Sequence, residues 1–197
     1  MKSISGNIAD MLWSQGIIQE NDIDKCKYGI DIFLSSFIEI LSILLIAIFM
    51  KTFLETVLLF VAFIPLRVYA GGYHADTKLK CYLISLGMYG IFYTIMKFLP
   101  CNTYQIINLF CTVFSTVIVV LNAPVIHFNK TINDIEKKHY RKFSIEICLT
   151  ETVIIILLTA ALPQNKIAMS LTIGQTSVAV SMIAAIIKNM FAKSKII

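Results

Sequence analysis

The sequence predicts an all-α membrane protein, a polytopic bundle of about six transmembrane helices with an interfacial amphipathic helix at its N-terminus. Three observations predict this class. The 197-residue chain is 57% hydrophobic and 15% charged, with a mean hydropathy of +0.78, whereas soluble domains carry about 25% charged residues. Six long apolar stretches divide it, and a helix of roughly 20 residues crosses a bilayer. Finally, its Lys and Arg residues gather between alternate stretches, as in multi-pass membrane proteins.

The segment 1–30 is predicted to lie at the membrane surface. Its apolar residues recur at helical spacing and form one apolar face, beside a tryptophan of the kind that prefers the headgroup region. An interfacial helix on the inner leaflet and a helix packed on the protein's own loops both fit this pattern. The sequence Asn21-Asp22 is typical of a helix cap, so the next helix is expected to begin several residues before the membrane. The apolar face consists of Ile4, Ile8, Met11 and Leu12, with Trp13 alongside.

A single membrane domain over residues 1–197 is expected to hold the six spans. The second, which ends at Pro65, and the third are the two expected to be short or re-entrant, because a short apolar stretch must tilt, thin the bilayer or turn back. The stretches run over about 31–50, 52–66, 82–99, 104–122, 143–163 and 167–187.

The basic residues predict the orientation of these spans. With the N-terminus in the cytoplasm and the spans alternating, all 17 Lys and Arg residues lie on the cytoplasmic side except Lys51, Lys97 and Lys166. Lys and Arg near span ends resist translocation, so we expect both termini in the cytoplasm. The loops 67–81 and 123–142, the second of them strongly basic, are then cytoplasmic as well.

The loop 67–81 carries the residues that indicate chemistry. His74 and Cys81 lie seven residues apart on it, and a thiol with an imidazole is the pair that a cysteine nucleophile and its base require. If residues 74–81 were one straight helix, its rise would separate the two by roughly 10 Å, whereas a hydrogen bond needs about 3 Å. The loop must therefore fold back, or another element must join the pair.

Neighbouring residues favour such a bend. Gly71 and Gly72 break the helical pattern, and Asp76 can cap the helix that becomes the third span. Cys81 then lies in the second helical turn with Lys78 one turn before it, where the helix dipole and the cation favour a thiolate. Asp76 is also the local candidate to orient the imidazole, although its capping role competes. On spacing alone, an interfacial histidine and a cysteine that merely packs are the commoner explanation.

A resemblance to a known family favours the nucleophile–base interpretation of His74 and Cys81 over the commoner explanation. The pattern Arg67-x-x-Ala-Gly-Gly-Tyr-His74-Ala, followed by Cys81, resembles the accessory gene regulator protein B (AgrB) family of bacterial quorum-sensing peptidases. A second stretch also fits the family's pattern, running from Asn122-Ala-Pro-Val through Asn129-Lys to the basic segment 137–142. Length and number of spans agree with the family, so the resemblance covers nearly the whole chain.

The resemblance implies a cysteine endopeptidase of the bacterial cytoplasmic membrane that needs no metal or cofactor. Its substrate would be an AgrD-like propeptide, whose C-terminal tail is released and whose remainder becomes a cyclic (thio)lactone autoinducer. It implies Cys81 as nucleophile and His74 as base and acid. Arg67 would clamp a substrate carboxylate or stabilise the oxyanion, or else anchor lipid phosphates. The expected partners are the propeptide, the bilayer and a second copy in a homodimer, and no nucleic acid.

Two other functions stay open on the residues alone. A transporter or exporter of a small peptide would use carboxylates in or near the spans, which are costly in lipid, and would need no nucleophile. Two of these carboxylates, Glu146 and Glu151, are not expected to share a helical face. A metalloprotease would recruit His74, Cys81 and His127 or Asp134, but the chain has no HExxH motif and its three histidines are scattered. The carboxylates are Glu39, Glu55, Glu146 and Glu151.

Overall fold

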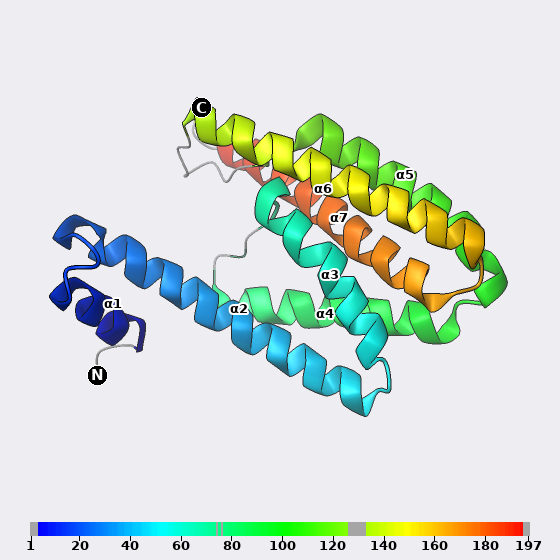
Figure 1. Ribbon diagram of the computed structural model, residues 1–197, viewed down its shortest axis with the longest axis horizontal. Coiled ribbons are helices and arrows are strands. Elements are labelled where there is room, and N and C mark those ends of the chain that lie inside the picture. Colours follow the sequence, from blue (N-terminus) through cyan, green and yellow to red (C-terminus); the bar gives the residue numbers. More distant parts are fainter. Residues whose placement is uncertain (1–3, 74, 76, 126–132, 195–197) are drawn as a thin grey trace. The chain divides into compact units, whose positions relative to one another are not determined.

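A computed structural model describes residues 4–73, 75, 77–125 and 133–194, and the described residues form helices and no strand (Figure 1). Short 3-10 turns at Glu20–Asp22 and Cys101–Thr103 precede two of the helices. The α-helices are α1 (Ile4–Ser14), α2 (Ile23–Phe49), α3 (Phe53–Ala70), α4 (Lys78–Phe98), α5 (Tyr104–Asn122), α6 (Asp134–Ala161) and α7 (Lys166–Ser194).

Six of these helices, α2 to α7, are long and apolar enough to cross a membrane. This confirms the predicted all-α bundle of about six spans. The two spans expected to be short have 18 residues in α3 and 21 in α4. At the rise of an α-helix these lengths correspond to about 27 and 31 Å, close to the roughly 30 Å of a bilayer's hydrocarbon core.

The expected end of the second span was wrong, because Pro65 lies inside α3 and the helix continues to Ala70. Proline removes one backbone hydrogen bond, but the last turn still closes, since the Gly71 N–H donates to the Arg67 carbonyl at 3.2 Å. A cation in the last turn also complements the negative end of the helix. The two helices therefore reach into the predicted loop, since α3 ends at Ala70 and α4 begins at Lys78.

The chain divides into two units, residues 1–46 and 47–197. In the first unit the predicted N-terminal helix is present as α1. Met11 of its predicted apolar face and the adjacent Trp13 are exposed, whereas Ser5 and Ala9 are buried. The helix that follows begins at Ile23, well before the apolar stretch at residue 31, as the acidic cap predicted.

The second unit is a bundle whose most buried helix is α7. Figure 1 shows α7, in orange and red, lying among α3, α5 and α6. A Cβ atom on Gly174 of α7 would lie 2.6 Å from the Leu59 carbonyl oxygen, so the backbones of α3 and α7 approach closely, as small residues allow in membrane bundles. The core beneath the α3–α4 loop consists of Leu66, Ala70, Val119, Ala123, Cys148, Val178 and Met182.

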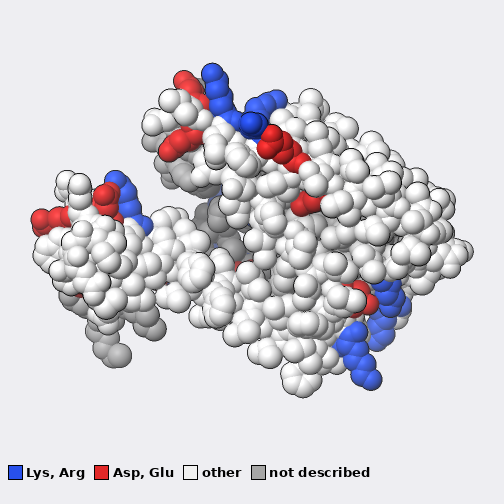
Figure 2. Space-filling model, in the orientation of Figure 1, with Lys and Arg blue, Asp and Glu red and all other residues white. Residues whose placement is uncertain are grey.

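Side-chain hydrogen bonds join α5, α6 and α7 across the bundle. The Gln175 amide donates to the Thr152 hydroxyl at 3.0 Å, and Thr152 lies 2.7 Å from the Thr116 hydroxyl. Because lipid offers no partners to polar groups, such groups must pair between helices. Charged side chains gather mostly toward the ends of this bundle, with a broad uncharged surface between them (Figure 2). This distribution is the one a membrane-spanning bundle requires.

Candidate functional site

The chain leaves α3 through two consecutive glycines that no other residue could replace without strain. Gly71 has φ of 75° and Gly72 has φ of 135°, backbone conformations that L side chains rarely adopt. A Cβ atom on Gly71 would collide with the Val125 carbonyl oxygen. A Cβ atom on Gly72 would collide with the Arg67 guanidinium and lie 2.9 Å from Ser181 Oγ. The predicted helix break is therefore also a point of close contact with three other segments.

The Arg67 side chain binds the backbone carbonyls of this turn. Its Nη1 donates to the Gly71 carbonyl at 2.6 Å, and its Nη2 donates to the Tyr73 carbonyl. The planar fork of a guanidinium suits two such acceptors, whereas a lysine ammonium offers only a point charge. These bonds are a third use of the side chain, besides the substrate contact and the lipid anchor expected from the sequence.

The same guanidinium also interacts electrostatically with Cys81. Cys81 is partly exposed and stands at the start of the second turn of α4, where its N–H donates to the Thr77 carbonyl at 3.1 Å. A nearby cation and a helix N-terminus both stabilise a thiolate relative to a thiol. The predicted position of Cys81 in α4 is confirmed, with Lys78 as the first residue of the helix.

The N-cap of α4 is Thr77 rather than the expected Asp76. The Thr77 hydroxyl accepts a hydrogen bond from the Lys80 N–H at 3.3 Å, which is the usual role of a capping side chain. His74 and Asp76 themselves lie outside the described residues, as does His127.

Two segments distant in sequence hold the glycine turn in place. From the end of α5, the Val125 N–H donates to the Ala70 carbonyl at 2.9 Å, and Val125 pairs with Gly71 in an isolated parallel bridge. From α7, Ser181 accepts from the Tyr73 N–H through both its carbonyl oxygen, at 2.9 Å, and its hydroxyl, at 3.1 Å. Nothing in the sequence marked Ser181, because it lies in an ordinary apolar stretch. Val125, in contrast, belongs to the Asn-Ala-Pro-Val motif that the sequence already singled out.

The basic segment after α5 differs from the predicted loop, because α6 already begins at Asp134. Asn133 and Glu136 form a capping box, which starts the helix before the apolar residues begin. One member of the segment is structural: Arg141 donates to the Ala123 carbonyl at 3.2 Å and to the Val120 carbonyl at 3.3 Å. Arg141 thus binds backbone carbonyls at the C-terminal end of α5. Val125, which contacts the glycine turn, follows two residues after Ala123.

Glu146 and Glu151 lie near each other although they are five residues apart on α6. Both line a pocket of about 250 Å³ together with Pro65, since a pocket beside a helix collects side chains from a wide arc. Glu146 lies 3.8 Å from the Lys142 ammonium. Glu151 has one buried carboxylate oxygen with no hydrogen-bond partner in the described part of the chain.

Comparison with known proteins settles the family. Residues 5–187 match the family profile described as Accessory gene regulator B, over most of the chain. This chain belongs to the AgrB family. Membership makes it a multi-pass membrane component of an accessory gene regulator system of quorum sensing, with a propeptide as the partner of that system.

Individual relatives of this AgrB-family chain are distant. An AgrB-like protein 1 of Clostridium perfringens is 26% identical over 137 residues, which are 70% of this chain and 71% of the relative. An AgrB-like protein of Listeria innocua is 30% identical over 54% of this chain and 53% of the relative. The accessory gene regulator protein B of Staphylococcus carnosus is 24% identical over 64% and 68%. No solved structure matches the fold.

Proposed function

We propose that this chain is a membrane cysteine endopeptidase that removes the C-terminal tail of an AgrD-like propeptide and helps to close the remainder into a cyclic (thio)lactone. Cys81 is the nucleophile and His74 its base. The observation that carries the proposal is the double use of Arg67, which holds the turn leading into His74 and also interacts with Cys81. The Arg67 charge therefore acts on the Tyr73 carbonyl, one residue before His74, and on the Cys81 thiol.

The reaction then has two acyl transfers. The Cys81 thiolate attacks the carbonyl at the C-terminal boundary of the future signal, and His74 protonates the departing amine of the tail. The resulting thioester is attacked by an internal Cys or Ser of the substrate. His74 takes the proton of that nucleophile, and Cys81 leaves as thiolate. A thioester is close in energy to a thiolactone, so the acyl energy is conserved if the site at the membrane edge limits water.

The surface near the site suits an acidic tail at the cytoplasmic face. Lys137, Lys138 and Lys142 are exposed on the first turns of α6, and exposed lysines attract anionic segments. Lys142 is partly engaged by Glu146, which leaves the first two as the stronger candidates. A propeptide with an amphipathic leader would lie on the same leaflet, which raises its concentration near Cys81. We further propose that both termini are cytoplasmic and that two copies form a homodimer.

The test is co-expression with the propeptide and detection of the released tail. Cys81→Ala and His74→Ala are expected to abolish cleavage, because each removes one half of the nucleophile–base pair. Cys101→Ala is the matched control, since Cys101 is also free but lies in the turn between α4 and α5. Continued cleavage by Cys81→Ala would overturn the proposal, and peptide export without cleavage would favour a transporter instead.

A further inference from the structure

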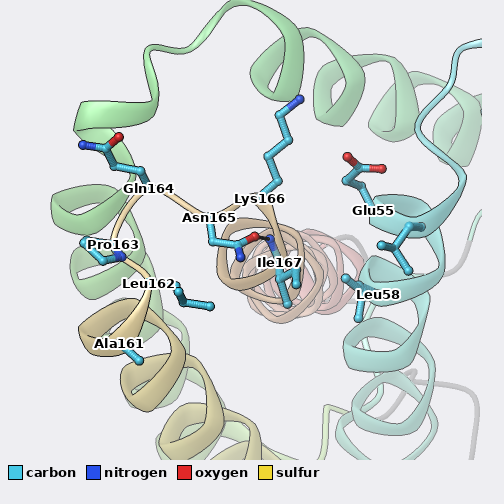
Figure 3. A pocket seen from close by; sticks show the side chains of 10 residues that line it. Glu55, Leu58, Ala161, Leu162, Pro163, Gln164, Asn165, Lys166 and Ile167 are labelled. Atoms are coloured by element: carbon cyan, nitrogen blue, oxygen red, sulfur yellow. Dashed lines mark hydrogen bonds between the residues drawn. The ribbon is translucent and has the colours of Figure 1, made fainter.

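A second cavity lies at the far end of the bundle from the glycine turn. It has a volume of about 710 Å³ and is formed by the first turns of α3 and the turn between α6 and α7 (Figure 3). Its residue Glu55 and the turn residue Gly71 are separated by nearly the whole of α3, which is about 24 Å of helix rise. The cavity is therefore separate from the Cys81 site.

The lining of this cavity is amphiphilic. Its wall is apolar, and its rim carries amide and charged groups. Figure 3 shows the Glu55 carboxylate, from α3, and the Lys166 ammonium, from α7, extending to the same rim from opposite sides of the opening. The apolar wall consists of Leu54, Leu58, Leu162 and Ile167, and the amide groups belong to Gln164 and Asn165.

The two charges on the rim do not satisfy each other. Within the described part of the chain, neither the Glu55 carboxylate nor the Lys166 ammonium takes part in an ion pair or a hydrogen bond. Lys166 is also the first residue of α7, so the positive end of that helix lies on the same side of the opening. Asn165 supports this end, because its Oδ1 accepts from the Ile167 N–H at 2.8 Å. The opening thus presents a cationic side and an anionic side above an apolar wall.

We propose that this cavity binds the headgroup of a zwitterionic phospholipid of the phosphatidylethanolamine class. Its phosphate lies against Lys166 and the N-terminus of α7, its ammonium donates to the Glu55 carboxylate, and the glycerol and upper acyl chain cover the leucine wall. A lipid is the occupant that the position favours, because the cavity lies where the membrane-spanning helices α3 and α7 begin and α6 ends, the level at which headgroups surround a membrane protein. Phosphatidylglycerol lacks the cation for Glu55. The ammonium of phosphatidylcholine has no N–H to donate.

Native mass spectrometry of the full-length protein in detergent tests this assignment. The protein is mixed with equal amounts of phosphatidylethanolamine, phosphatidylglycerol and phosphatidylcholine, and the retained lipid is counted for each. We expect wild type to retain phosphatidylethanolamine at least fivefold over the other two. Glu55→Gln is expected to lose the preference over phosphatidylglycerol. Lys166→Gln is expected to lose the retention of phosphatidylethanolamine, because the lipid phosphate loses its cation. Lys51→Gln is the matched control, because Lys51 lies just before α3 but does not line the cavity.

Two further measurements keep the outcome decisive. The charge-reversed variant Lys166→Glu is expected to retain less phosphatidylethanolamine than Lys166→Gln, because its carboxylate repels the lipid phosphate. Folding of each variant is checked by monodispersity and by a cooperative thermal transition. Equal retention of phosphatidylethanolamine by wild type and Glu55→Gln would overturn the proposal. So would binding of a free zwitterionic peptide in preference to the lipid. Neither readout depends on propeptide cleavage.

Discussion

At the scale of the residue, Arg67, Gly71 and Gly72 form one unit. The sequence predicted that the glycines break the helix and that Arg67 contacts either substrate or lipid phosphates, but not that the guanidinium binds the backbone of its own turn. Its acceptors, the Gly71 and Tyr73 carbonyls, point at it only because both glycines adopt positive φ. A residue's hydrogen-bond partners depend on the local backbone path, and composition does not specify that path.

Gly71→Ala is expected to lower both thermal stability and propeptide cleavage. The backbone conformation alone would cost an L residue about 1–3 kcal/mol, and the new Cβ would also collide with the Val125 carbonyl. Thermal unfolding and tail release measure the two effects. Gly87→Ala is the control, since a Cβ on Gly87, inside α4, meets nothing within 4 Å. The structure would be contradicted if both variants behaved alike.

At the scale of the element, the ends of the helices decide where the site residues lie. α3 passes through Pro65 and α6 begins at Asp134, and neither boundary follows from hydrophobicity. Capping groups and last-turn hydrogen bonds set these ends, whereas an apolar stretch marks only the part of a helix that lies in lipid. As a result both ends of the predicted 15-residue loop 67–81 are helical, and Arg67 and Cys81 lie near the ends of α3 and α4.

Arg141→Gln is expected to reduce kcat for cleavage and to lower the unfolding temperature slightly. It removes two bonds to the end of α5, which on this largely exposed side chain contribute about 1 kcal/mol. Lys142→Gln, one residue later and exposed, is expected to leave stability unchanged and only to raise KM through weaker attraction of an acidic tail. Steady-state kinetics of both variants distinguish these effects. A rise in KM alone for Arg141→Gln would instead assign Arg141 to substrate binding.

At the scale of the whole molecule, the distribution of Lys and Arg residues predicts which ends of the spans face the cytoplasm. The segments predicted to be cytoplasmic do meet in the fold. The turn after α3 contacts Val125 from the loop 123–142. The Lys188 ammonium, beyond the sixth apolar stretch, lies 5.0 Å from the Tyr73 ring centroid, a cation–π contact. Lys166 is one of the three Lys residues predicted on the non-cytoplasmic side. It is the first residue of α7, at the end of the bundle opposite the turn after α3.

Thiol labelling in intact cells checks this orientation with the protein's own cysteines. In a variant retaining only Cys101, which is exposed in the turn before α5, a membrane-impermeant maleimide is expected to react without permeabilisation. In a variant retaining only Cys81, reaction is expected only after permeabilisation, because the positive-inside rule puts the loop 67–81 in the cytoplasm. Labelling of Cys81 from outside would reverse the topology and remove the proposed site from the cytoplasmic leaflet.

The sequence by itself determined the class of protein, the six apolar spans, the charge asymmetry and the spacing of Arg67, His74 and Cys81. These are properties of composition and of neighbours along the chain, so they can be read locally. Only the tertiary structure decided that Ser181, 108 residues beyond Tyr73, holds the turn, that Arg67 interacts with Cys81, and that Glu55 and Lys166 share one cavity. Those contacts arise because helix packing makes neighbours of residues whose own surroundings in the sequence carry no sign of each other.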